Sequence, residues 1–216
     1  MMGRRGMLGV LGLFAGGLAV LLSGCGSNDR QLRYKVTVEV DTPFGLRTGS
    51  SVVETDMDDN GFTFGQAPYV DLGGGRYLFA LLNDPFSKKI MYRLAFNVLQ
   101  YPELQPPLDR EKHLYVQAKD MKPFGVVRRE DYPMLVTFGD INDPKTVREV
   151  DPGIVRRITF QVVDQDEPLT GGLEEKFKWA VDGNLNFNKG SLIRGTADEV
   201  PFAQLFNATN FVWRKK

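Results

Sequence analysis

The most specific chemical motif in the sequence surrounds its single cysteine, Cys25. The residues before it, Leu22-Ser23-Gly24, are one branched apolar residue and two small ones, the pattern at which bacterial lipoproteins are modified and cleaved. A cysteine sulfur is a strong nucleophile that can take a diacylglyceryl group, and small residues let a signal peptidase reach the backbone. The motif predicts lipid attachment at Cys25, which becomes the first mature residue. The alternative is an ordinary secretory signal in which the cysteine has no role.

Residues 1–24 have the layout of a secretory signal peptide. Arg4 and Arg5 give a positive start, and the apolar stretch 7–22 is shorter than the roughly 20 residues that a spanning helix needs. The two arginines also have the look of a twin-arginine signal. The ordinary positive start is the favoured interpretation, because nothing in the chain requires a cofactor loaded before export, and no cofactor is predicted.

The predicted anchor fixes where the domain lies. Two or more acyl chains hold a protein stably at a membrane, and Gly26 after the cysteine favours the outer membrane, on its periplasmic side, in a cell with two membranes. Residues 25–31 are the lipidated cysteine and a polar tether, whose six residues after Cys25 reach at most about 20 Å. We expect one globular domain, 32–216, close to the membrane surface. Its expected partners are membrane lipid through the acylated cysteine and an envelope protein.

The amino-acid composition argues against several classes of protein. The chain has 27 basic and 27 acidic residues, 42% apolar and 11% aromatic residues, which is typical of a globular protein. The absence of a basic excess argues against a nucleic-acid-binding protein. One cysteine excludes a disulfide framework, and a single histidine, His113, cannot form a histidine-based metal cluster alone.

The strongest metal candidate is an acidic loop. Asp56, Asp58 and Asn60, followed by Gly61, match the first half of a calcium loop. The twelfth position should be a bidentate glutamate and is Ala67. We therefore interpret this segment as an acidic Asn-Gly turn of a hairpin and assign no metal site.

The sequence contains only weak candidates for catalytic residues. Six carboxylates could furnish a pair for hydrolysis, but most of them lie beside Pro or Gly, where Asp favours turns. His113 is interpreted as a residue of a strand edge or of the surface. No residue is assigned a catalytic role. The six carboxylates are Asp140, Asp143, Asp151, Asp164, Asp166 and Glu167.

Alternating apolar and polar residues with a β-branched bias predict strands in the first half of the domain. Turn residues separate these runs, which predicts an antiparallel meander over residues 33–82. The predicted strands are 34–40, 50–55, 69–71 and 76–82, and the predicted turns are 42–45, 58–61 and 73–75.

The apolar period then becomes helical, which predicts a helix over 86–100 with Leu94 central on its buried face. Strand-rich sequence with one strong helix predicts the α+β class: a largely antiparallel sheet, one main covering helix and short C-terminal helices. Further strands are predicted at 113–118, 134–138 and 154–163, and short helices near 173–177 and 201–206.

Three stretches resemble a group of uncharacterised bacterial lipoproteins, found mainly in proteobacteria. They are the region 34–54, with "VEVDTPFGLRTGSSVVE", the region 135–153, "LVTFGDINDPKTVREVDPG", and the region 156–176, "RRITFQVVDQDEPLTGGLEEK". The resemblance implies a shared fold and an envelope location. It implies no functional residues, because the group has no established activity.

The sequence as a whole predicts a membrane-anchored cell-envelope lipoprotein with a noncatalytic binding or structural accessory domain. The alternative is an envelope hydrolase that uses Asp/Glu chemistry.

Overall fold

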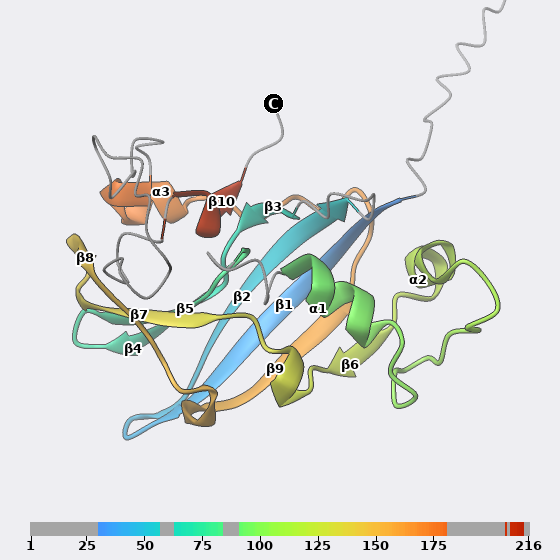
Figure 1. Cartoon of the computed structure of the whole chain (residues 1–216), viewed down its shortest axis with the longest axis horizontal. Coiled ribbons are helices and arrows are strands. Elements are labelled where there is room, and N and C mark those ends of the chain that lie inside the picture. The colour runs from blue at the N-terminus through green and yellow to red at the C-terminus, as the bar shows by residue number, and fades with distance from the viewer. Residues whose placement is uncertain (1–29, 57–62, 84–90, 181–205, 207, 214–216) are drawn as a thin grey trace, which may run out of the picture.

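The computed structural model describes residues 30–56, 63–83, 91–180, 206 and 208–213 (Figure 1). These residues form two antiparallel sheets with short helices around them, which confirms the predicted α+β class. The predicted turn 58–61 and helix 201–206 lie outside the described residues, apart from Phe206. The helices are α1 (Met91–Val98), α2 (Leu114–Met121) and α3 (Leu173–Lys176), with 3-10 turns η1 (Arg129–Asp131), η2 (Pro152–Ile154), η3 (Lys178–Ala180) and η6 (Ala208–Asn210).

The first sheet is built around a long hairpin of two 12-residue strands, β1 and β2, in which Gln31 pairs with Asp56 and Thr42 with Gly45. The strand order is β10-β3-β2-β1-β9-β6. Its strands are β1 (Gln31–Thr42), β2 (Gly45–Asp56), β3 (Thr63–Gln66), β6 (Phe124–Val126), β9 (Val155–Val162) and β10 (Val212–Trp213).

The second sheet has the strand order β4-β5-β7-β8 and corrects the predicted single meander over 33–82. The hairpin at 73–75 is present, but it belongs to this other sheet. Turn spacing predicted the hairpins and carried no information on which sheet they join. The strands are β4 (Tyr69–Gly73), β5 (Arg76–Ala80), β7 (Leu135–Asp140) and β8 (Asp143–Glu149).

The strand predicted at 113–118 was wrong, because this segment is the helix α2. Its short apolar run, Leu114 to Val116, fits either structure, and only Ala118 is fully buried. Lys122 ends the helix in the left-handed conformation (φ 47°), and its N–H donates to the Ala118 carbonyl at 2.9 Å. His113 precedes this helix and is exposed, so it is a surface residue and not a strand-edge residue.

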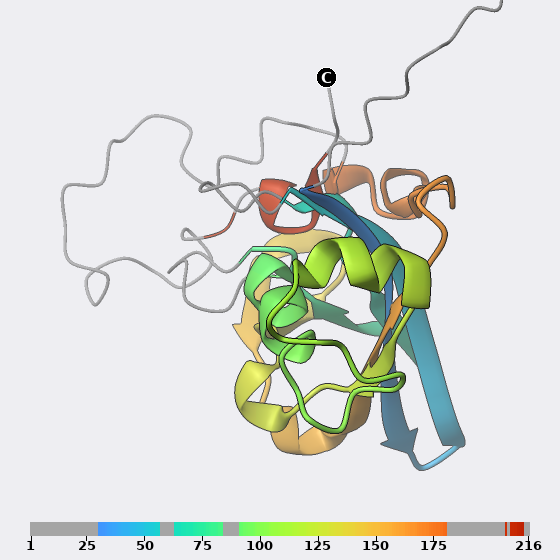
Figure 2. The ribbon, with the colours of Figure 1, turned by 90° about the vertical axis from the view of Figure 1, so that its right-hand side faces the viewer.

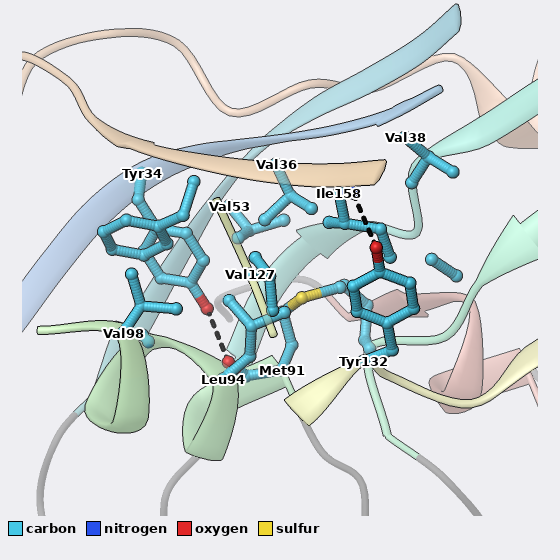
Figure 3. Packing of buried hydrophobic residues seen from close by; sticks show 14 of the residues in the cluster. Tyr34, Val36, Val38, Val53, Met91, Leu94, Val98, Val127, Tyr132 and Ile158 are labelled. Carbon is cyan, nitrogen blue, oxygen red and sulfur yellow. Dashed lines mark hydrogen bonds between the residues drawn. The ribbon is translucent and has the colours of Figure 1, made fainter. Parts of the chain in front are cut away.

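The helix predicted over 86–100 is confirmed where it is described, as α1, and it covers the inner face of the first sheet (Figure 3). Met91, Leu94 and Val98 pack there against apolar side chains of β1 and β2. The Tyr34 hydroxyl donates to the Met91 carbonyl at 2.9 Å, which fixes the first turn of the helix to the sheet. Burial raises the pKa of Tyr34, so this hydroxyl stays protonated.

A second core lies on the other face of the four-stranded sheet and is mainly aromatic. Along β5 and the residues after it, Leu78 and Ala80 enter the first core, while Phe79 and Leu81 enter the second. β5 is therefore buried on both of its faces, which explains why it is almost continuously apolar. Segments from the C-terminal half complete the second core with Leu173, Phe177, Trp179, Phe206 and Phe211.

The two sheets meet where β4 crosses β2 at Gly49. A Cβ atom on Gly49 would lie 1.7 Å from the carbonyl oxygen of Tyr69 and 3.0 Å from the Val70 nitrogen. These are backbone atoms, so no rotation of a neighbouring side chain relieves the overlap. The position requires glycine for space.

We expect Gly49→Ala to lower the free energy of unfolding by more than about 2 kcal/mol, because one strand must move away from the other. Chemical denaturation of the full chain measures this. Ser50→Ala, at the neighbouring exposed position, is the matched control and should change it by less than about 0.5 kcal/mol. Equal effects of the two variants would contradict the role given to Gly49.

We expect Leu94→Ala to cost about 2–5 kcal/mol, since the side chain is 1% exposed at the centre of the α1 interface. The control is Arg93→Ala on the exposed side of the same helix. A loss below about 0.5 kcal/mol for Leu94→Ala would mean that α1 does not depend on this contact.

Candidate functional site

The predicted lipid-attachment residue, Cys25, lies outside the described residues, and so do Asp58 and Asn60 of the acidic loop. Asp56 is the last residue of β2 and is half-buried. The described chain begins at Arg30, and β1 starts at Gln31. A tether that follows Cys25 would therefore enter the domain at the amino end of β1.

Three of the predicted hydrolase carboxylates are turn residues, as the turn interpretation predicted. The Oδ1 atoms of Asp140, Asp143 and Asp151 each accept a hydrogen bond from the backbone N–H two residues later, at 2.9, 3.0 and 2.7 Å. This is the local bond by which aspartate stabilises turns. Each carboxylate is exposed and engaged with its own backbone.

The other three predicted carboxylates lie in the exposed segment after β9. Asp164 forms an ion pair with Lys122, and both side chains are largely exposed. Asp166 and Glu167 are exposed, and the Glu167 carbonyl accepts a hydrogen bond from Arg33 at 2.7 Å. The bond from Arg33, on β1, attaches this segment to the first sheet.

The buried carboxylates are ones that the sequence did not single out. Glu54 and Glu39 project from the outer face of the first sheet and are almost fully buried. Arg33 lies opposite Glu54 and bonds it at 2.7 Å, and Arg157 lies opposite Glu39 and bonds it at 2.9 Å. These cross-strand pairs neutralise the buried charges, and their partners follow only from strand register.

A polar cluster joins α1 to η1. Asp131 accepts a hydrogen bond from Asn97 at 2.6 Å and a second from the Tyr101 hydroxyl. The Arg128 guanidinium lies 4.3 Å from the centre of the Tyr101 ring and bonds Glu103 at 2.8 Å. Burial and the bond to Asp131 raise the pKa of Tyr101, which keeps the hydroxyl a donor. The cluster fixes the η1 turn against the helix.

Among the described residues, the most exposed large apolar side chains belong to the end of the β1–β2 hairpin, residues 41–48, which we call the hairpin tip. Phe44 is 75% exposed and Leu46 is 48% exposed. Pro43 and Phe44 form the turn, and Gly45 (φ +100°) takes the left-handed conformation that lets the chain return. An exposed Phe44 beside an exposed Leu46 makes this end of the hairpin the candidate contact surface.

The hairpin tip extends past its neighbouring strands. Among the described residues, β9 pairs with β1 only as far as Val40, and β3 pairs with β2 only at Glu54 and Thr55. Figures 1 and 2 show the hairpin projecting from the body of the domain. Ile154, which is 45% exposed, precedes the β9 residue paired with Val40 and so adds a third apolar side chain at the base of the tip.

The hairpin tip and the entry of the tether lie at opposite ends of β1. Twelve residues of strand separate Gln31 from Thr42 by about 36 Å. The sequence predicted the turn at 42–45 but not its exposure, which depends on where β9 and β3 stop. The one feature of the sequence that could have indicated this exposure is the aromatic residue Phe44 within the predicted turn.

The described residues exclude two kinds of feature among themselves, a metal-binding cluster and a membrane-spanning helix. They contain no group of three or more His, Cys, Asp and Glu side chains placed to hold a metal ion. In the same residues, no helix has the length and apolar character to cross a membrane.

No protein-family model, curated protein or solved structure matches this chain. Function is therefore inferred from the chain's own residues.

Proposed function

We propose that this protein is a membrane-anchored lipoprotein of the cell envelope and that its domain is a noncatalytic binding module. Cys25 carries the lipid, with the outer membrane favoured over the inner membrane. The hairpin tip is the contact surface, and its partner is another envelope protein. The observation that carries the proposal is the exposure of Phe44 and Leu46 at the end of β1 that lies farthest from the tether.

The geometry of β1 supports a partner in this direction. The tether reaches at most about 20 Å, and the hairpin carries its tip about 36 Å beyond Gln31. With β1 directed away from the membrane, the tip lies beyond the reach of the tether itself. The hairpin tip is then available to a protein in the periplasm or to one held on the opposite side of the periplasm.

The residue types support a protein contact. Burying the surface that Phe44 and Leu46 still expose, in an apolar pocket, contributes about 2–4 kcal/mol before the entropic cost of association. Arg47 and the Asp41–Arg156 ion pair, 3.4 Å apart, form a polar rim around the apolar centre. An apolar centre with a polar rim is the usual composition of a protein interface.

The first test concerns the anchor. We expect the membrane-fraction protein to incorporate labelled fatty acid and Cys25→Ser to abolish the label and block maturation. The variant keeps its apolar signal, so fractionation alone does not distinguish the two forms. Unlabelled wild-type protein cleaved at a different position would overturn the proposed anchor.

The second test concerns the hairpin tip. A photo-crosslinking amino acid at Phe44, in the full chain in intact cells, should give a discrete product with one envelope protein. The matched control carries the same group at Lys145, an exposed residue of β8. Equal products from both positions, or a product that contains only a second copy of this chain, would contradict the proposed contact.

A further inference from the structure

The ammonium group of Lys176 is surrounded by three aromatic rings. Its Nζ atom lies 4.9 Å from the centre of the Tyr69 ring, 4.6 Å from that of Tyr77 and 5.6 Å from that of Phe177. The rings meet pairwise at 69°, 81° and 76°. Three nearly perpendicular rings around one cation form the walls of an aromatic cage, the arrangement that recognises organic ammonium groups.

The fold holds these walls firmly. Tyr69 and Tyr77 lie on the same face of the β4–β5 hairpin, and Phe177 directly follows α3. Behind them, fully buried Phe79 contacts all three rings at centroid distances of 5.4–6.5 Å. Leu173 secures α3 in the same core. The walls of the cage are therefore held by the second hydrophobic core.

A carboxylate adds charge to the cage. The Oδ2 atom of Asp71 lies 3.9 Å from the Lys176 ammonium, while Oδ1 accepts a hydrogen bond from the Gly73 N–H at 2.9 Å. The turn therefore fixes the carboxylate. At 3.9 Å the interaction with Lys176 is an ion pair too long to be a hydrogen bond.

The cage holds its cation through ring faces and charge, and these interactions suit a cation without N–H groups. A quaternary ammonium group cannot donate hydrogen bonds and loses less hydration on entering an aromatic cage. The site is also open to solvent: the Lys176 side chain is 38% exposed and that of Asp71 is 52% exposed. The partial exposure of Lys176 gives its side chain a direct path to solvent.

We propose that the cage formed by Tyr69, Tyr77, Phe177 and Asp71 is a binding site for quaternary ammonium groups, and that Lys176 is its internal occupant. A ligand must displace the Lys176 side chain to enter the cage. Lys176 therefore competes with the ligand and weakens its binding to the wild-type protein. The ligand carries a trimethylammonium group, as free choline or as a choline headgroup. The site is separate from the hairpin tip, and the lipid anchor is not needed for it.

The test is a choline titration of the full chain monitored by tryptophan fluorescence. The chain has two tryptophans, Trp179 and Trp213, and the ring of Trp179 stacks on that of Phe177 with centroids 5.8 Å apart. The neutral isostere 3,3-dimethylbutan-1-ol, at the same ionic strength, separates cation recognition from simple apolar contact. We expect saturable binding of choline and at least about tenfold weaker binding of the alcohol. Phosphatidylcholine vesicles, compared with free choline, show which source of the group is preferred.

Variants test the role of each part. Lys176→Ser empties the cage and should tighten choline binding about tenfold, because an intramolecular competitor is removed. Adding Tyr77→Leu to Lys176→Ser removes one wall and should abolish the gain. Lys35→Ser, at an exposed lysine of β1, is the matched control and should bind choline as the wild type does.

Two outcomes would overturn the proposal. A folded Lys176→Ser protein that binds choline no better than the neutral alcohol would leave Lys176 as a purely structural contact. If that variant does not fold, the wild-type titration decides, and equal responses to choline and to the alcohol would reject the site.

Discussion

At Gly49 the backbone of β2 passes against the backbone of β4, so closely that a Cβ atom there would overlap the Tyr69 carbonyl. This approach sets how the six-stranded and four-stranded sheets are joined. It brings β4 and β5 over the inner face of the first sheet, where Val70 and Leu78 complete the core formed by β1, β2 and α1. The face of the second sheet that points away from this core must then be covered by other parts of the chain.

That second face determines the organisation of the C-terminal half. Phe79 and Val136 would be exposed if the C-terminal segments did not cover them. Phe177, Trp179 and Phe211 supply this cover, with rings in edge-to-face contact with Phe79. Aromatic packing of this kind adds to area burial and fixes orientation. The rings around Lys176 gain their rigidity from this packing, so the cage is a product of the core.

The elements with strong local patterns were predictable from the sequence. Alternation from Tyr34 to Val40 gave β1, and the apolar face around Leu94 gave α1. Leu114 to Val116 was misassigned because three apolar residues fit a strand or a helix equally well. The second sheet was missed because its separation depends on a tertiary contact at Gly49.

The candidate sites were less predictable. The turn at 42–45 was predicted, but the exposure of Phe44 depends on where the neighbouring strands end. The cage joins Tyr69 and Tyr77 to Lys176, about a hundred residues later, and no local pattern connects them. The pairing of Glu54 with Arg33 depends on register in the same way. Lipid attachment at Cys25 is a local motif and stays a prediction, because that residue lies outside the described chain.

The length of the β1–β2 hairpin has a consequence for how the protein could evolve. Because side chains alternate between the two faces of a strand, adding two residues to each strand beside the turn keeps the facing of every other side chain and moves the hairpin tip outward by about 7 Å. Adding a single residue to each strand at the same place would instead turn the side chains of the hairpin tip, Phe44 and Leu46 among them, to the opposite face of the hairpin. The hairpin is thus a spacer of adjustable height that changes in steps of two residues per strand. Related chains could differ in the height of this hairpin through this one dimension, without altering the core.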